Sequence, residues 1–214
     1  MSDSVVFTTI FGGYDTLKDP IVYDKDMSYI CFTDDPGLVS DVWEIRVVEP
    51  EIPDDSSKSS RFIKINAHKF LDDFKYSLYV DGTMILKSKF LVPFILNGYK
   101  IAVETHPWRD CIYEEAKECI RLHKVEPKIV NEQIEIYRQY KFPKHAGLYA
   151  NWMIAREHND SVLAERCEEW WDHVLHYSTR DQISFPLVFK DYTIGTIPIG
   201  LRKSLVDSKP HVKR

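Results

Sequence analysis

The sequence has no apolar run long enough to span a membrane, because no window of about 18 residues is continuously apolar. Its first residues, M-S-D-S-V-V-F-T-T-I-F-G-G-Y-D, include no basic segment, so we expect neither a signal peptide nor an anchor. Positive charge is not in excess either. The 28 basic and 33 acidic residues give a net charge of −5, which argues against a nucleic-acid partner but leaves room for a small phosphate pocket.

Cysteine is scarce, and its spacing is not that of a metal site. The four cysteines are Cys31, Cys111, Cys119 and Cys167. Cys111 and Cys119 fall on one predicted helix about 12 Å apart, which is too far for a disulfide. We therefore expect four reduced thiols and a cytoplasmic protein.

Several catalytic motifs are also missing from the sequence. Without G-x-G-x-x-G a dinucleotide-binding Rossmann site is disfavoured, and without G-x-x-x-x-G-K-[ST] there is no P-loop. The absence of G-x-S-x-G and H-E-x-x-H removes the usual serine-hydrolase and zinc-protease interpretations.

The composition is that of an ordinary globular chain, with 214 residues, 44% hydrophobic and 29% charged. This length predicts one domain, which we place at residues 1–203, and a loose polar tail or linker at 204–214. Aromatic residues make up 13% and include 5 Trp and 12 Tyr. Such side chains suit stacking on bases or sugars, although core packing is their commoner role.

Apolar runs and amphipathic stretches alternate along the chain, which predicts an α/β fold with a mostly parallel sheet flanked by helices. The apolar runs predict strands at 5–10, 28–32, 43–48, 76–80, 100–104 and 148–155. The amphipathic stretches predict helices from Ser59 or Ser60 to Phe74, and over 88–97, 110–123, 128–140, 160–177 and 180–190, with Asp110 and Asp160 as N-caps.

Ligands of such sheets bind at the carboxyl ends of strands, so residues that follow strands are candidates. Asp81 ends a predicted strand, where a carboxylate can hold a divalent cation that bridges two phosphates. Gly82 would let a diphosphate approach the backbone. The alternative is a plain Asp-Gly turn. A full Asp-x-Asp would be stronger, but residue 83 is Thr.

The segment after the first strand could form a pocket for a nucleotide base, with Tyr14 stacking on it. Its alternative is a simple glycine turn. Neighbouring strand ends should bring further groups to the same sheet edge. The candidates for this nucleotide site are Thr8, Thr9, Gly12, Gly13, Tyr14 and Asp34.

Three other groups of residues could contact phosphate or sugar. Arg61 and Lys64 are three residues apart on one helix face and could clamp a phosphate, or could simply be solvated. The segment Thr105–Asp110 brings His106 and Arg109 together with a tryptophan, which could instead be buried with structural neighbours. The run Arg180-Asp181-Gln182 begins a helix, where both acid and amide could reach a cleft.

In combination these segments resemble one family, the glycosyltransferase-like domain family named after plant pollen-turgor and seed-mucilage proteins. The blocks that carry the resemblance are V-V-F-T-T-I-F-G-G-Y-D, Y-I-C-F-T-D-D-P, S-L-Y-V-D-G-T, H-P-W-R-D-C-I-Y-E-E-A, G-L-Y-A-N-W-M-I-A-R-E-H-N and W-W-D-H-V-L-H-Y-S-T-R-D-Q-I-S-F. They cover roughly Val5 to Phe189. The resemblance implies a GT-A fold and the transfer of a sugar from a nucleotide donor.

The sequence is also similar, more weakly, to retaining transferases of the glycogenin and bacterial galactosyltransferase kind. This similarity implies that Asp81, Thr83 and Arg61 occupy donor positions and that Arg180, Asp181 and Gln182 form the catalytic group. Thr83 departs from the second Asp of that pattern. The C-terminal metal histidine of those enzymes has no clear counterpart, since the only late histidine, His211, falls in the expected tail.

The resemblance therefore implies a transferase that moves a sugar from a nucleotide-diphosphate sugar, with UDP the expected nucleotide, to a glycan or other hydroxyl acceptor. It implies retention of configuration and Mn²⁺ (or Mg²⁺) on Asp81. The family blocks add His106, Arg109, Ala150 and Asn151 as sugar- or phosphate-binding residues. Two alternatives stay open at this point: a non-catalytic module that binds nucleotide sugars or carbohydrates, and a hydrolase of such a substrate.

Overall fold

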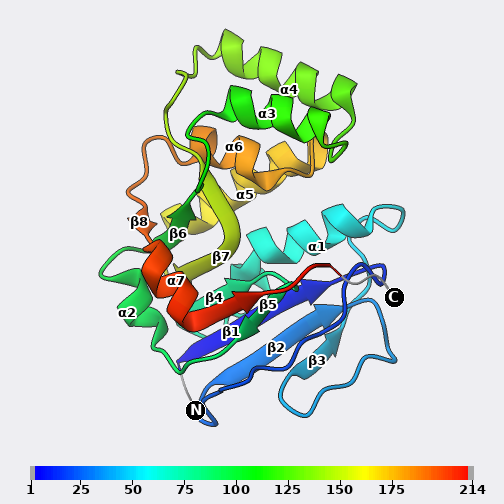
Figure 1. Cartoon of the computed structure of the whole chain (residues 1–214), viewed down its shortest axis with the longest axis vertical. Helices are drawn as coiled ribbons and strands as arrows, with labels where there is room; N and C mark the ends of the chain where they lie inside the picture. Colours follow the sequence, from blue (N-terminus) through cyan, green and yellow to red (C-terminus); the bar gives the residue numbers. More distant parts are fainter. Residues whose placement is uncertain (1–2, 212–214) are drawn as a thin grey trace.

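A seven-stranded mixed sheet forms the centre of the protein, in a computed structural model that describes residues 3–211 (Figure 1). The strands lie in the order β3-β2-β1-β4-β7-β6-β8. Strand β7 is antiparallel to both neighbours, and every other pairing in this sheet is parallel. The predicted α/β fold with a mostly parallel sheet is thus confirmed. The strands are β1 (Ser4–Ile10), β2 (Ser28–Thr33), β3 (Glu44–Val47), β4 (Tyr76–Val80), β6 (Ile101–Thr105), β7 (Tyr149–Glu157) and β8 (Gly195–Thr196).

Helices cover both faces of the sheet. Because successive side chains of a strand point to opposite faces, Phe7 of β1 faces one apolar cluster and Val6 faces the other. Both residues are fully buried, as expected for a central strand of a parallel sheet. The helices are α1 (Ser56–Ile65), α5 (Ser161–His176) and α6 (Asp181–Val188) on the Phe7 side, and α2 (Val92–Leu96) and α7 (Ile199–Leu205) on the Val6 side.

Helices α3 (Ile112–Arg121) and α4 (Pro127–Gln139) form a separate layer that packs on α6 rather than on the sheet (Figure 1). Their apolar faces meet those of α6 through Ile112, Ile134 and Ile183. The loop between β6 and α3 must therefore run outward from the sheet edge, and it carries His106 and Arg109 with it.

Two predicted helix starts are wrong, because other residues take the capping role. Helix α1 begins at Ser56, where the Asp55 side chain accepts a hydrogen bond from the Lys58 backbone N–H. The hydroxyl of Ser59 instead bonds to the backbone of Ile52 at 3.0 Å. Helix α3 is preceded by Cys111, not capped by Asp110. The prediction for Asp160 is confirmed, since its carboxylate accepts from the Leu163 N–H.

Two further predicted boundaries also differ from the structure. Helix α1 ends at Ile65 instead of continuing to Phe74, and a short 3-10 turn, η1 (Ala67–Lys69), follows it. The second predicted helix, expected over 88–97, is reduced to the single short helix α2.

The expectation of a loose tail from residue 204 is wrong for 204–208. Helix α7 ends at Leu205, and β9 (Val206–Ser208) pairs antiparallel with β5 (Met84–Leu86), a strand that the sequence pattern did not indicate. Leu205 and Val206 are buried. The Lys209 N–H then bonds to the Thr83 carbonyl, so the chain end lies beside the segment that follows β4.

All four cysteines are buried free thiols, which confirms the expectation of no disulfide. Within residues 3–211, no helix has the length and apolar character needed to cross a membrane.

Candidate active site

A cavity of about 840 Å³ opens at the carboxyl ends of β1, β4 and β6, where the sheet topology places a ligand site. Most of the residues singled out from the sequence line it. They are Thr9, Tyr14, Arg61, Lys64, Asp81, Gly82, Thr83, His106, Arg109, Asn151, Arg180, Asp181 and Gln182.

Asp81 sits where β4 ends, and its position is fixed by the backbone. Its N–H donates to the Trp152 carbonyl of β7 at 2.8 Å. One carboxylate oxygen, Oδ1, accepts from the Gly82 N–H at 3.2 Å and from the Tyr79 hydroxyl at 3.3 Å. A Cβ at Gly82 would meet Asp15 at 3.5 Å and Ile10 at 3.6 Å, which are ordinary contacts, so packing does not require glycine there.

Asp181 is the most strongly paired group of the cavity. It begins α6, is 5% exposed, and contacts two cations of α1. Lys64 Nζ donates to Asp181 Oδ2 at 2.5 Å, and Arg61 Nε lies 3.5 Å from the same oxygen. Burial acts to raise the pKa of Asp181, but the charges of Lys64 and Arg61 outweigh it and lower that pKa. Burial also lowers the pKa of Lys64 to about 8.

The other two residues of the predicted catalytic run lie beside this ion pair. The Arg180 guanidinium donates to the Gln182 Oε1 at 2.8 Å. The indole N–H of Trp170 donates to the Asp181 carbonyl at 2.9 Å and anchors the start of α6 from the core. The helix N-terminus adds a partial positive charge near Asp181.

Five predicted donor or sugar residues do not line the cavity, and their roles remain predictions. The Gly12 N–H donates to both carboxylate oxygens of Asp34 at 3.0 Å. Gly12 and Gly13 have φ near +60°, and a Cβ at Gly12 would lie 2.7 Å from Ser56. This loop presents Tyr14, which is 51% exposed. The five residues off the cavity are Thr8, Gly12, Gly13, Asp34 and Ala150.

Asn151 lies at an irregularity in the sheet. The pairing of β6 with β7 shifts register between Val103 and Glu104. Asn151 is one of the β7 residues that have no partner in β6 at this shift. The side chain lines the cavity and is 1% exposed. Neither its amide oxygen nor its amide nitrogen has a hydrogen-bond partner within residues 3–211. Such a buried amide is costly unless a ligand satisfies it.

The β6–α3 loop contributes His106, Trp108 and Arg109 to the cavity lining. His106 Nδ1 accepts from the Arg109 N–H at 3.2 Å, and Arg109 Nε donates to Glu115 at 2.6 Å. Burial lowers the pKa of His106, and the charges of Arg109 and Arg180 lower it further, although Glu115 opposes them. The imidazole is therefore neutral at pH 7.

Sequence reasoning missed several residues of the cavity. Asp15 bonds to Lys18 at 2.7 Å and to His211 at 2.9 Å, and the Tyr14 and His211 ring centroids lie 5.0 Å apart. The only late histidine thus reaches the cavity because β9 carries the chain back across the sheet edge. Trp108, the tryptophan that the sequence placed with His106 and Arg109, lines the cavity as well and is 74% exposed, so the alternative of a buried tryptophan is wrong.

Asp81, the predicted cation ligand, shares the cavity with Asp15 and His211, but these two bond to each other, and Asp15 also bonds to Lys18. In the part of the chain that the structure describes, one group of three ligand-bearing side chains has its ligand atoms within 4.8 Å of one another. This group is Cys111, Glu114 and His145, which do not line the cavity. A cation at Asp81 would therefore take further ligands from phosphates and water, which is common for Mg²⁺.

The fold and the cavity together define a GT-A-like α/β domain with a polar site at its strand ends. A family model described as TOD1/MUCI70, glycosyltransferase-like domain, matches residues 1–197, and the chain belongs to this family. The resemblance noted from the sequence is thereby confirmed. No curated protein shows significant similarity to the chain.

Proposed function

We propose that the protein transfers a sugar from a nucleotide-diphosphate sugar, with UDP the expected nucleotide, to a hydroxyl group of a glycan acceptor. The observation that carries this proposal is the buried, unsatisfied amide of Asn151 in the same cavity as Asp81 and the Asp181 ion pair. A sugar brings hydroxyls that can satisfy an amide and a carboxylate, and a diphosphate brings charge that needs cations. Membership of the glycosyltransferase-like family supports the same assignment.

The diphosphate belongs at the Asp81 end. The carboxylate of Asp81 fits a hard cation, and Mn²⁺ or Mg²⁺ bound there would supply positive charge to the leaving diphosphate. Arg61 and Lys64 line the same cavity and add positive charge of their own. Tyr14, half exposed beside Thr9, offers an aromatic face for the base.

The sugar belongs between Asn151 and the start of α6. In the transfer, the bond from the anomeric carbon to the diphosphate oxygen breaks, and a bond to the acceptor oxygen forms. The proton of the acceptor hydroxyl goes to the departing diphosphate on the same face, which retains the anomeric configuration. Asp181 accepts hydrogen bonds from sugar hydroxyls, and the Gln182 carbonyl oxygen stabilises positive charge that develops on the sugar.

The acceptor belongs on the side of the β6–α3 loop. Trp108 presents an indole that is 74% exposed at the cavity edge, next to His106, whose ring centroid lies 5.6 Å away. An exposed aromatic face suits the apolar face of a sugar ring. We therefore place the acceptor glycan against Trp108.

The alternative of a non-catalytic binding module has one specific observation in its favour, namely Thr83 at the position of the second Asp. The two functions differ in a measurable product. A transferase releases the nucleoside diphosphate faster when an acceptor such as a 4-nitrophenyl glycoside is added. A module binds the donor without release, and a hydrolase releases it at the same rate with or without the glycoside.

Donor binding and stereochemistry test the proposal directly. Calorimetry with a panel of UDP-sugars should give binding that depends on Mn²⁺. The anomeric configuration of the product, read by NMR, should equal that of the donor. A product of opposite configuration would overturn retention, and a lack of binding to every donor would overturn the donor class.

A further inference from the structure

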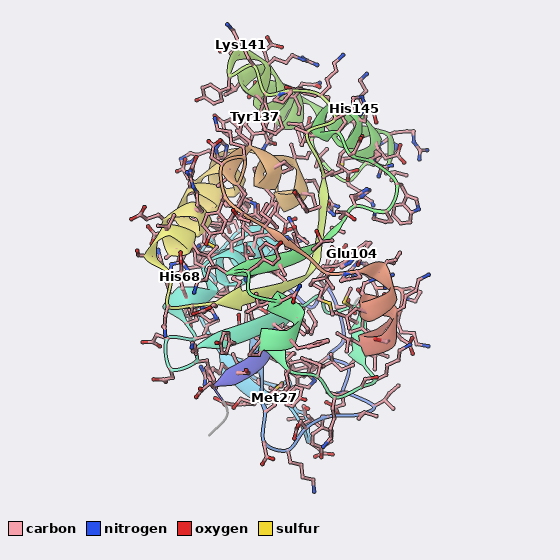
Figure 2. The ribbon with its side chains drawn as sticks, turned by 90° about the vertical axis from the view of Figure 1, so that its left-hand side faces the viewer. Met27, His68, Glu104, Tyr137, Lys141 and His145 are labelled. Carbon is pink, nitrogen blue, oxygen red and sulfur yellow. The ribbon has the colours of Figure 1, made fainter. Side chains whose placement is uncertain are left out.

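A cluster of metal-ligating side chains lies outside the cavity, where two loops meet beside α3. The β6–α3 loop and the α4–β7 loop are joined by backbone hydrogen bonds, from His106 N to the Leu148 carbonyl at 2.8 Å and from Gly147 N to the Asp110 carbonyl at 3.0 Å. His145 lies in the second loop, on the α3–α4 side of the molecule in Figure 2, well away from Glu104 of β6.

Three ligand atoms of different chemistry converge at this junction. The Cys111 sulfur, a Glu114 carboxylate oxygen and a ring nitrogen of His145 lie within 4.8 Å of one another. Cys111 and Glu114 are three residues apart at the start of α3, so they share one side of its first turn. A tetrahedral zinc ion holds such atoms about 3.5 Å apart, which a small rotation of the two exposed side chains would achieve.

The surroundings of His145 match those of a metal-binding histidine. Its Nδ1 lies 2.7 Å from Asp110 Oδ1, so a carboxylate can orient the ring through one nitrogen while the other is left for a metal. His145 also adopts φ +56°, a left-handed conformation that is uncommon for a residue other than glycine. The start of α3 adds a partial positive charge that favours an anionic thiolate and carboxylate there.

We propose that Cys111, Glu114 and His145 bind a zinc ion. A thiolate, an imidazole and a carboxylate are each ligands that zinc takes, whereas Mn²⁺ and Mg²⁺ prefer oxygen ligands. Glu114 and His145 are exposed, so the ion has a path from solvent and a fourth position open to water. The ion would join the α4–β7 loop to the loop that carries His106, Trp108 and Arg109 of the cavity.

The experiment measures bound metal rather than activity, so it is independent of the proposed function. The full chain is stripped with a chelator, loaded with zinc and dialysed, and its metal content is measured by mass spectrometry. We expect one zinc per chain in the wild type. The affinity for zinc, measured by competition with a chromophoric chelator, should fall at least tenfold in His145→Ala and in Glu114→Gln. The matched control is His176→Ala, because His176 is also exposed and paired with an aspartate, Asp172, at 3.1 Å.

Cobalt loading gives a second measurement. The wild-type chain should show the sulfur-to-cobalt charge-transfer absorption, and Cys111→Ser should lose it while keeping its circular dichroism spectrum. If Cys111→Ser does not fold, the two exposed variants decide the question alone. The proposal is overturned if the wild-type chain retains no zinc after dialysis, or if His145→Ala and Glu114→Gln bind it as tightly as His176→Ala does.

Discussion

The two ends of the cavity differ in how their charges are neutralised. At the α6 end, Asp181 is buried and already paired with Lys64 and Arg61. At the β4 end, Asp81 is half-buried, and within residues 3–211 its carboxylate bonds to neutral donors, the Gly82 N–H and the Tyr79 hydroxyl. At the first end the fold itself therefore compensates the charge of the carboxylate and leaves positive charge in excess. At the second end a bound cation can compensate the carboxylate.

This difference predicts that the two aspartates contribute to different properties. Removing one partner of a buried ion pair leaves an uncompensated charge in the interior, which is strongly destabilising. Removing a strand-end carboxylate next to solvent leaves no such buried charge and costs little stability. Asp181 should therefore matter for stability as well as activity, and Asp81 for ligand binding alone.

The largest expected effect is on stability. Asp181→Asn should lower the free energy of unfolding by about 3 kcal/mol, because Lys64, 4% exposed, would keep a buried charge without its partner. Urea denaturation measures this loss, and the double variant Lys64→Met, Asp181→Asn should recover part of it. A single-variant loss no greater than that of Asp81→Asn would contradict the comparison.

The second effect is on donor affinity. Asp81→Asn should weaken Mn²⁺-dependent binding of a UDP-sugar by about a hundredfold, or about 2.7 kcal/mol, while changing the midpoint of urea unfolding little. Calorimetry with and without Mn²⁺ measures the affinity. The control is Asp191→Asn, because Asp191 is exposed and does not line the cavity. Equal affinity in Asp81→Asn and the control would exclude Asp81 as the cation or diphosphate residue.

The third effect is a pH dependence that Lys64 should produce. Its pKa of about 8 in the free protein means that the ammonium is charged below this pH and neutral above it. Affinity for UDP should therefore fall as the pH rises through about 8, by up to about tenfold per pH unit. Lys64→Arg keeps its charge at these pH values, so its affinity should stay flat. A wild-type profile as flat as that of Lys64→Arg would rule out this role.

The smallest effect concerns the base. Tyr14→Ala should weaken UDP and a UDP-sugar alike by about 1 kcal/mol, because a single stacking contact is lost from an exposed side chain. Tyr140→Ala, another exposed tyrosine that lies outside the cavity lining, should leave both affinities unchanged. Loss of UDP-sugar affinity without loss of UDP affinity would move Tyr14 to the sugar end.

Local sequence patterns correctly predicted several elements of the fold. The apolar runs at 5–10 and 76–80 correspond to β1 and β4 because a strand buried on both faces has to be continuously apolar. The carboxyl ends of parallel strands meet at one edge of the sheet, so residues that follow strands in the sequence are predicted to lie there. This rule correctly predicted that Asp81 and Tyr14 line the cavity. Asp160 could be recognised as an N-cap because its carboxylate accepts a hydrogen bond from a backbone N–H only three residues further along the chain.

Other elements could not be predicted from the local sequence. The strand β9 has few apolar residues, and it is stabilised by its pairing with β5 far earlier in the chain and by the burial of Val206. The start of α1 was misplaced because several nearby polar residues could cap it, and tertiary contacts chose among these. Ser59, for instance, bonds to Ile52 instead of capping a helix. The start of α3 was misplaced because no side chain in the described part of the chain caps it, and the Asp110 carboxylate contacts His145 instead.

The sequence by itself determined the α/β class, the family and the strand-end candidates, because these follow from local periodicity and from residue types in order. Only the tertiary structure decided which charges meet. It paired Lys64 with Asp181, brought His211 to Asp15, and set Cys111 beside His145. The physical reason is that each pair is distant in sequence, so its contact depends on how whole helices and loops pack and not on any local preference.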